Sequence, residues 1–316
     1  MLSRRSLLAG SLATAGLAGA ALARTNTPTL GKIKPANTLN IPHADLRPEI
    51  AKRGLIPRLQ RASLCTSYAS AFLIAYMQKL DNAPGVAPYA SAEYVSWAAL
   101  GGTKTANASS RFDQVVQGYY KWGAVAEADF PAEGEFTTAR RPDPRVIDTG
   151  MSQWRLKADI FRANDGSYGL QPAHIAKIRD YLDKGIPIAA GLRLTESPSL
   201  VDYASVSAVL GLNAGLSSYG HSVGIVGYQD IPGDTEGGGG YFVAYNHGGP
   251  DWDNPGFKPQ AGYFFLSYAF FAANTADLLA FTPLARGESV PAVPPMPHPA
   301  TLLPDAPMSM IGRARK

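Results

Sequence analysis

The chain reads QRASLCTSYA from Gln60 to Ala69, and this stretch contains Cys65, the only cysteine among its 316 residues. Apolar residues at helical spacing predict a helix that begins at Ser63 or Cys65 and ends near Leu80, before a Pro-Gly turn. A lone thiol has no internal disulfide partner, so either nucleophilic chemistry or packing as a small apolar side chain explains it. A helix start suits nucleophilic chemistry, because the helix dipole stabilises a thiolate there. Taken alone, however, a single cysteine is more often a packing residue, so the partners found elsewhere in the chain decide between the two.

The rest of the chain changes from helical to strand-like periodicity. Besides the helix after Cys65, helices are predicted over residues 91–100, 109–122 and 172–184, and strands over residues 186–194, 222–228, 241–245 and 262–268. Helices first and strands later predict an α+β chain of two lobes, and a cleft between two lobes is a common place for a binding site.

Four motifs resemble, in their order along the chain, the papain family of cysteine peptidases. They are Gln60 with Cys65-Thr66-Ser67 at a helix start, YGHSVGIVGY around His221, YFVAYN ending at Asn246, and GYFF from Gly262. The 156 positions between Cys65 and His221 slightly exceed the roughly 130 to 150 typical of the family. The resemblance covers about residues 46–270. It implies a papain-like two-lobe fold with a helical N-terminal lobe, an antiparallel β-barrel-like C-terminal lobe and an active-site cleft between them.

The resemblance implies a role for each of four side chains. Cys65 is the expected nucleophile, and the imidazolium of His221 would help to stabilise its thiolate, since a free thiol has a pKa of about 8.5. His221 would then give a proton to the leaving amine, while the amide oxygen of Asn246 orients the ring. The backbone N–H of Cys65 and the side-chain amide of Gln60 would bind the oxyanion. The implied partner is a peptide or protein substrate, hydrolysed through a Cys65 thioester without a cofactor.

Three features near these residues depart from the family pattern. Thr66 stands where the family usually has Trp, and Gln60 is one residue closer to the cysteine than usual. After the Asn, the usual Ser-Trp-Gly is replaced by His247-Gly248-Gly249, so Trp252 is the remaining candidate for an aromatic cover over the Asn–His hydrogen bond.

A glycine pair is a further candidate for substrate binding. Gly101-Gly102 resembles the pair with which the family hydrogen-bonds an extended substrate. A helix stop explains the same two glycines equally well.

The N-terminus carries an export pattern. It has paired arginines in Ser-Arg-Arg-Ser-Leu-Leu, a soft apolar stretch and small residues up to Ala23. These features predict a twin-arginine-type signal peptide over residues 1–23, cleaved after Ala23, and a periplasmic or secreted protein. A linker over 24–45, a peptidase domain over 46–282 and a Pro-rich tail over 283–316 are expected to follow. Within the domain the lobes are predicted at about 60–155 and 156–282.

Composition excludes other classes of partner. The formal net charge of +4 includes arginines in the signal and at the C-terminus, so the middle of the chain is close to neutral. No basic stripe interleaved with aromatic residues is visible, which argues against nucleic-acid binding. After removal of the signal, no stretch is long and apolar enough to predict a stable membrane span.

Alternatives to the peptidase interpretation remain at this point. Cys65, His221, His247 and Asp251 are candidate metal ligands, but no closely paired ligand spacing is present, so no metal is predicted. The same fold is also compatible with a cell-wall peptide amidase or transpeptidase, or with a catalytically weakened peptide-binding relative.

Overall fold

The computed structural model describes residues 43–60, 62–78, 88–102, 110–132, 140–195, 209–210, 216–235, 237–249, 262–285 and 287–290. The predicted signal peptide, the linker up to residue 42 and the tail from residue 291 lie outside the described residues. The elements, in chain order, are β1 (Ala44–Asp45), α1 (Arg47–Lys52), α2 (Cys65–Gln78), α3 (Ala92–Ala99), α4 (Phe112–Trp122), α5 (Pro144–Ser152), β2 (Leu156–Arg162), α6 (Pro172–Asp183), β3 (Ile188–Thr195), β4 (Val209–Leu210), β5 (Leu216–Asp230), β6 (Gly240–Tyr245), β7 (Tyr263–Ser267), α8 (Tyr268–Asn274) and β8 (Thr275–Pro283).

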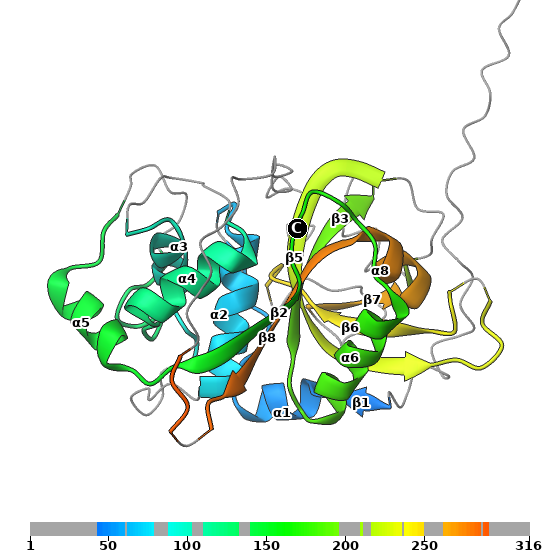
Figure 1. The fold of residues 1–316 in the computed structure, drawn as a ribbon, viewed down its shortest axis with the longest axis horizontal. Helices are drawn as coiled ribbons and strands as arrows, with labels where there is room; N and C mark the ends of the chain where they lie inside the picture. Colours follow the sequence, from blue (N-terminus) through cyan, green and yellow to red (C-terminus); the bar gives the residue numbers. More distant parts are fainter. Residues whose placement is uncertain are drawn as a thin grey trace, which may run out of the picture.

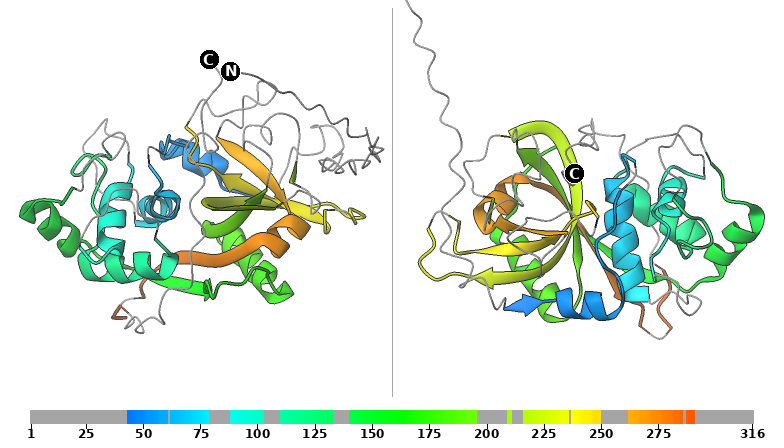
Figure 2. Two further views of the ribbon diagram at one scale, coloured as in Figure 1. Left: turned by 90° about the horizontal axis from the view of Figure 1, so that it is seen from above. Right: turned by 180° about the vertical axis from the view of Figure 1, so that it is seen from behind.

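Helix α2 lies at the centre of the molecule. Figure 1 shows α3, α4 and α5 on one side of it and the sheet on the other, and the view from behind in Figure 2 agrees. Of its fourteen residues, all except Met77 are buried, which fits a helix covered on both sides. The helix begins at Cys65, and Tyr68 N–H donates to Leu64 O at 2.9 Å in its first turn. The helical lobe, defined as α2 to α5, therefore presents the N-terminus of α2 toward the strands.

Local sequence signals account for the packing of α3 against α4. Ser91 accepts a hydrogen bond from Tyr94 N–H and so caps α3, and Gly123 ends α4 with a positive φ of 76°. Gly118 lies so close to α3 that an added Cβ would approach the carbonyl carbon of Ala98 to 2.3 Å. A residue without a side chain is therefore needed at position 118 for these two helices to touch.

The strands form a sheet with an open path. Its order is β2-β8-β3-β5-β6-β7-β4, and β1 pairs with β5 off this path. The described pairings are antiparallel except that between β4 and β7. The expected α+β architecture is confirmed, with an open sheet in place of a barrel-like closure. The strands together with α6 and α8 are called the sheet lobe below.

Several elements were absent from the sequence prediction. They are α1, α5, β2, β4, α8 and β8. In addition, residues Ala44–Asp45 of the expected linker form strand β1 against Tyr228 and Gly227. At the other end, Glu288 of the expected tail pairs with Lys157 Nζ at 2.5 Å. Among the described residues, none of the helices has the length and apolar character that crossing a membrane requires.

Candidate active site

One pocket is lined by residues of both lobes, and it contains Cys65 and His221. The helical lobe contributes the start of α2 and the residues just before α4, while the sheet lobe contributes β3, β5, β8 and the loop between β2 and α6. Its lining consists of Cys65, Thr66, Ser110, Arg111, Asn164, Tyr168, Gly191, Leu192, Gly220, His221, Ser222, Ala276 and Asp277. Two sequence-predicted residues, 156 positions apart, thus reach the same hollow.

Cys65 is the first residue of α2 and is buried. The first N–H groups of a helix have no partner within the helix, and their dipoles favour negative charge at that end. The thiol is not part of a disulfide. The position therefore supplies the electrostatic environment that a thiolate needs.

His221 lies in the middle of β5, opposite Leu192 of β3, with a buried ring. Its Nε2 is 2.9 Å from Oδ1 of Asn246, so the proton of the neutral ring is placed on Nε2. Its Nδ1 has no hydrogen-bond partner among the described residues. Burial lowers the pKa of His221 to about 4, and the Asn246 bond offsets part of this effect. At neutral pH the ring is therefore uncharged, which differs from the imidazolium that the resemblance led us to expect, and Nδ1 can accept a proton.

Asn246 follows directly after β6 and is fully buried. Its backbone N–H donates to Gly262 O at 2.9 Å, just before β7. The residue is therefore fixed between two neighbouring strands, which holds its amide oxygen against the ring of His221.

The residues after Cys65 and His221 are bonded to each other. Thr66 Oγ1 and Ser222 Oγ are 3.1 Å apart, and both side chains are buried. This contact joins the start of α2 to β5 beside the two predicted catalytic residues. Thr66, one of the noted departures from the family pattern, thus has a specific polar partner in the opposite lobe.

Gln60 is buried, and its Nε2 donates to Ala62 O at 2.6 Å. One of its two amide hydrogens is therefore used locally, and Gln60 is outside the pocket lining given above. Its backbone N–H donates to His247 O at 2.7 Å, and Leu59 forms a β-bridge with Gly248. The segment before Cys65 is thereby attached to the segment after Asn246. The role of Gln60 in oxyanion binding stays a prediction.

The ring of His247 occupies an aromatic slot. It lies 5.5 Å from the ring centroid of Tyr68 and 5.3 Å from that of Tyr245. Neither ring nitrogen has a partner among the described residues. Burial lowers the pKa of His247 well below its usual value, and the nearby His221 and Arg58 add to this effect. Trp252 and Asp251 lie outside the described residues.

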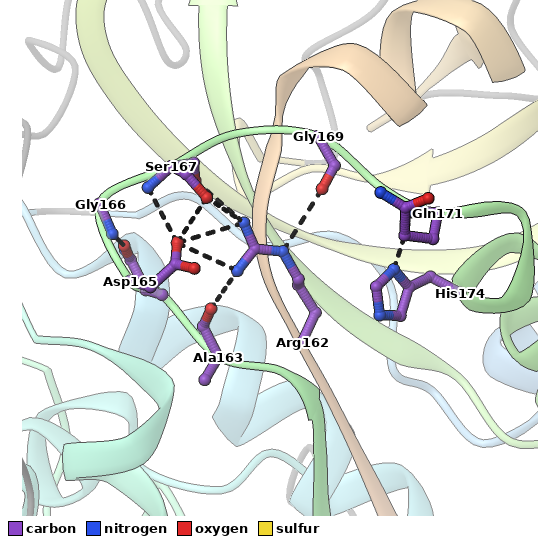
Figure 3. Close-up of polar contacts among 9 residues, drawn as sticks. Arg162, Ala163, Asp165, Gly166, Ser167, Gly169, Gln171 and His174 are labelled. Atoms are coloured by element: carbon purple, nitrogen blue, oxygen red, sulfur yellow. Dashed lines mark hydrogen bonds and ion pairs between the residues drawn. The ribbon is translucent and has the colours of Figure 1, made fainter.

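One wall of the pocket is a loop organised by Arg162. Figure 3 shows its guanidinium surrounded by loop acceptors: the carbonyls of Ala163, Ser167 and Gly169, the Ser167 hydroxyl and the Asp165 carboxylate. The loop carries Asn164 and Tyr168 into the pocket lining. The guanidinium of Arg193 lies 4.0 Å from the Tyr168 ring centroid and holds that ring by a cation–π contact.

Gly101 and Gly102 lie at the end of α3, with positive φ values of 74° and 81°. Their N–H groups donate to Ala98 O and Trp97 O, as expected of a helix stop. They are outside the lining of the pocket that holds Cys65, so substrate binding by this pair stays a prediction.

Sequence reasoning did not single out Asp277, Ser222 or Arg162. Asp277 is a carboxylate in an otherwise apolar run on β8, which is the one signal that marks it in the sequence. The hydroxyl and guanidinium contacts depend on tertiary structure and leave no local pattern.

Comparison with known proteins supports the fold. No protein-family model matches the chain, and no curated protein matches it either. Xylellain, a cysteine protease from Xylella fastidiosa, superposes with a TM-score of 0.55 over 80% of this chain and 91% of its own, at 17% identity. The Carica candamarcensis cysteine protease CMS1MS2, solved in complex with E-64, gives 0.47 over 77% and 99%, at 12% identity. Digestive procathepsin L 3 of Tenebrio molitor gives 0.44 over 76% and 69%, at 13% identity.

These observations define a class of two-lobe proteins in which a cysteine begins a central helix and a histidine lies on the neighbouring sheet. The chain has the papain-like fold, as its motifs predicted.

Proposed function

We propose that this protein is a cysteine peptidase in which Cys65, His221 and Asn246 form the catalytic group. The observation that carries the proposal is the shared pocket of Cys65 and His221, with Asn246 Oδ1 2.9 Å from His221 Nε2. That hydrogen bond leaves Nδ1 as the basic nitrogen of the ring. The arrangement matches the needs of acyl transfer: a nucleophile, a base and a group that orients the base.

The reaction begins with proton transfer from the Cys65 thiol to Nδ1 of His221. The sulfur bonds to the carbonyl carbon of the substrate, and His221 gives the proton to the nitrogen of the leaving amine as the C–N bond breaks. Water then attacks the thioester while His221 takes its proton, and the carboxylic acid product leaves as the thiol is restored. The neutral resting state of His221 suits the first step, since only an uncharged ring accepts a proton.

The oxyanion requires two donors close to the sulfur. The backbone N–H of Cys65, at the N-terminus of α2, is one candidate, since it belongs to the same residue as the sulfur and the helix dipole favours negative charge there. The second amide hydrogen of Gln60 is the other candidate, because its first is bonded to Ala62 O. The hydrogen bond from the Gln60 backbone N–H to His247 O fixes the backbone of Gln60, and the side chain of Gln60 takes no part in it.

The test uses the purified chain with a peptide library and an iodoacetamide probe. Wild type is expected to cleave peptides and to be labelled at Cys65, Cys65→Ala to do neither, and His221→Ala to be labelled more slowly and to lose cleavage by about two to four orders of magnitude. A folded wild type that cleaves no peptide between pH 4 and 8 would refute the proposal. Thr149→Ala, at an exposed position on α5, is the control variant and should cleave peptides and be labelled like the wild type.

We further propose export through the twin-arginine pathway, on the basis of the N-terminal pattern up to Ala23. N-terminal sequencing of the protein recovered from the periplasm should show that it begins at Arg24. Replacement of both Arg4 and Arg5 by Lys should retain the precursor in the cytoplasm, and unchanged export would refute the pathway.

A further inference from the structure

A carboxyl group lies inside the same pocket as the predicted nucleophile. Asp277 is on β8, is 6% exposed and lines the pocket with Cys65 and His221. A carboxylate is rarely placed in such a setting without a partner or a use, because its desolvation is costly. The catalytic group proposed above has no role for it.

The neighbouring strand leaves room for this side chain. Gly191 of β3 is the register partner of Asp277, and an added Cβ at Gly191 would come within 2.0 Å of Oδ1. The ladder between the two strands is irregular between Gly191 and Leu192. The carboxyl group therefore fills the space that a side chain at position 191 would take, and it forms part of the pocket floor. Its other neighbours in the lining include the small residues Ser110 and Ala276.

The cations around the pocket are already engaged. The Arg111 guanidinium binds both carboxylate oxygens of its neighbour Asp113. Arg162 holds the loop acceptors described above, and Arg193 lies over Tyr168. The charges of Arg111 and Arg162 act on Asp277 from a distance, opposed by that of Asp113.

Two neutral groups also lie near Asp277 among the described residues. His221 lines the same pocket and is uncharged at neutral pH. The backbone N–H of Phe112, at the start of α4, donates a hydrogen bond to the carboxyl group. Within the described part of the chain, the carboxyl group thus has a backbone donor, and no cationic side chain binds both of its oxygens.

We propose that Asp277 makes this pocket select a basic side chain, Lys or Arg, of the peptide substrate. This inference rests on the proposed peptidase function and names its substrate class. A cationic side chain that enters between Gly191 and Tyr168 would place its N–H donors at the carboxylate. An acidic side chain would meet the carboxylate directly and be excluded.

The protonation state of Asp277 gives the selection a pH dependence. Burial raises its pKa to about 7, and the negative charge of Asp113 adds to this, while Arg162 and Arg111 oppose it. The carboxyl group is charged above that pH and neutral below it. A cationic substrate side chain favours the charged form, so the preference for Lys or Arg over Leu should increase from pH 6 to pH 8.

The experiment compares peptides that differ only in one residue, Lys, Leu or Glu, scanned through the positions next to the cleaved bond. Wild type is expected to show a higher kcat/KM for Lys than for Leu at one position, with the ratio rising severalfold between pH 6 and 8. In Asp277→Asn, which keeps the shape, the ratio should fall at least tenfold and lose its pH dependence. Asp180→Asn, an exposed carboxylate on α6, should leave the ratio unchanged. An equal ratio in wild type and Asp277→Asn, or no preference for Lys at any position, overturns the proposal.

Two further measurements keep the inference separate from folding and from catalysis. If Asp277→Asn does not fold, the ratio of kcat/KM for the Lys peptide to that for the Leu peptide in wild type decides. A ratio that does not change between pH 6 and 8 overturns the proposal. If wild type cleaves nothing, calorimetric binding of the Lys and Leu peptides to Cys65→Ala decides. Tighter binding of the Lys peptide that is lost in Cys65→Ala/Asp277→Asn supports the role of Asp277 even though the peptidase function has failed, and equal binding overturns it.

Discussion

Thr66 Oγ1 lies 3.1 Å from Ser222 Oγ, so the residue after the predicted nucleophile is bonded to the residue after the predicted base. The contact joins the helical lobe to the sheet lobe at the pocket itself. A hydroxyl pair at this point does two things: it sets the distance between α2 and β5, and it satisfies two buried polar groups that would otherwise be costly.

Thr66→Val keeps the shape of Thr66 and removes the bond. We expect the free energy of unfolding to fall by about 1 to 2 kcal/mol, because the Ser222 hydroxyl is left buried without its partner. The value of kcat/KM should fall severalfold, since α2 and β5 are held less tightly. Urea denaturation and steady-state kinetics measure both effects. A double-mutant cycle with Ser222→Ala should give a coupling energy of about 1 kcal/mol, and additive effects would contradict the pairing.

Asn246→Asp should move the pH profile of activity. Burial lowers the pKa of His221 to about 4, so the neutral base is lost only in acid, and kcat/KM of the wild type should decline as the pH falls toward 4. A carboxylate next to Nε2 favours the imidazolium and raises the pKa of His221, so this acidic limb should shift to higher pH. Asn246→Ala, which adds no charge, should instead lower kcat by roughly 10- to 100-fold. If the acidic limb of the pH profile of kcat/KM is the same in wild type and Asn246→Asp, the roles of His221 as base and of Asn246 as its partner are contradicted.

His247→Phe should stabilise the protein, most of all in acid. The phenyl ring of the variant fits between Tyr68 and Tyr245, where the histidine ring lies. The substitution removes two buried ring nitrogens that have no partner among the described residues. The pKa of His247 is lowered on folding, so below about pH 6.5 the unfolded chain takes up a proton that the native chain does not, and stability is lost as the pH falls. The advantage of the variant should therefore grow by about 1 kcal/mol or more per pH unit between pH 6.5 and 5. Urea denaturation at pH 7, 6 and 5 tests this, and His247→Gln, which keeps buried polar atoms, should not stabilise.

Gly118→Ala should destabilise the helical lobe although alanine is the better helix former. A Cβ at this position would come within 2.3 Å of the backbone of Ala98, so α3 and α4 must separate. We expect a loss of about 3 kcal/mol or more, at the upper end of overpacking costs. Gln117→Ala, one position earlier on α4 and partly exposed, should change stability by less than about 0.5 kcal/mol. Thermal melts of both variants make the comparison, and equal melting temperatures would show that the helices do not touch there.

Arg162→Met should affect substrate binding more than the chemical step. The side chain anchors the loop that carries Asn164 and Tyr168, and it does not line the pocket itself. We expect KM to rise several-fold with kcat changed by less than twofold. Arg145→Met, in helix α5, is the control. A fall in kcat at constant KM would contradict this positioning role.

The sequence predicts the helical half of the fold well because its signals are local. Helix α2 has a long apolar pattern, and Gly123 marks the end of α4 at the residue where the structure ends it. Strand β8 was missed because the run DLLAF is buried on both faces and so lacks the alternation of a half-exposed strand. Helix α5 was missed because its only buried residue is Gly150, which leaves no apolar stripe.

The candidate site divides in the same way. Cys65, His221 and Asn246 were predicted from motif order, and the structure brings His221 into contact with Asn246 and into one pocket with Cys65. Thr66 and Ser222 carry no pattern that would pair two hydroxyls across 156 positions. Asp277 was missed with its strand, since a residue cannot be assigned to a pocket before its element is known.

The bond from Gln60 N–H to His247 O, with the bridge between Leu59 and Gly248 beside it, has a mechanical consequence. The chain entering α2 and the chain leaving Asn246 are joined through the backbone, where a substitution other than proline leaves both the donor and the acceptor in place. Any widening of the space between the two lobes must then bend the chain elsewhere, so that Cys65 and Asn246 keep their spacing.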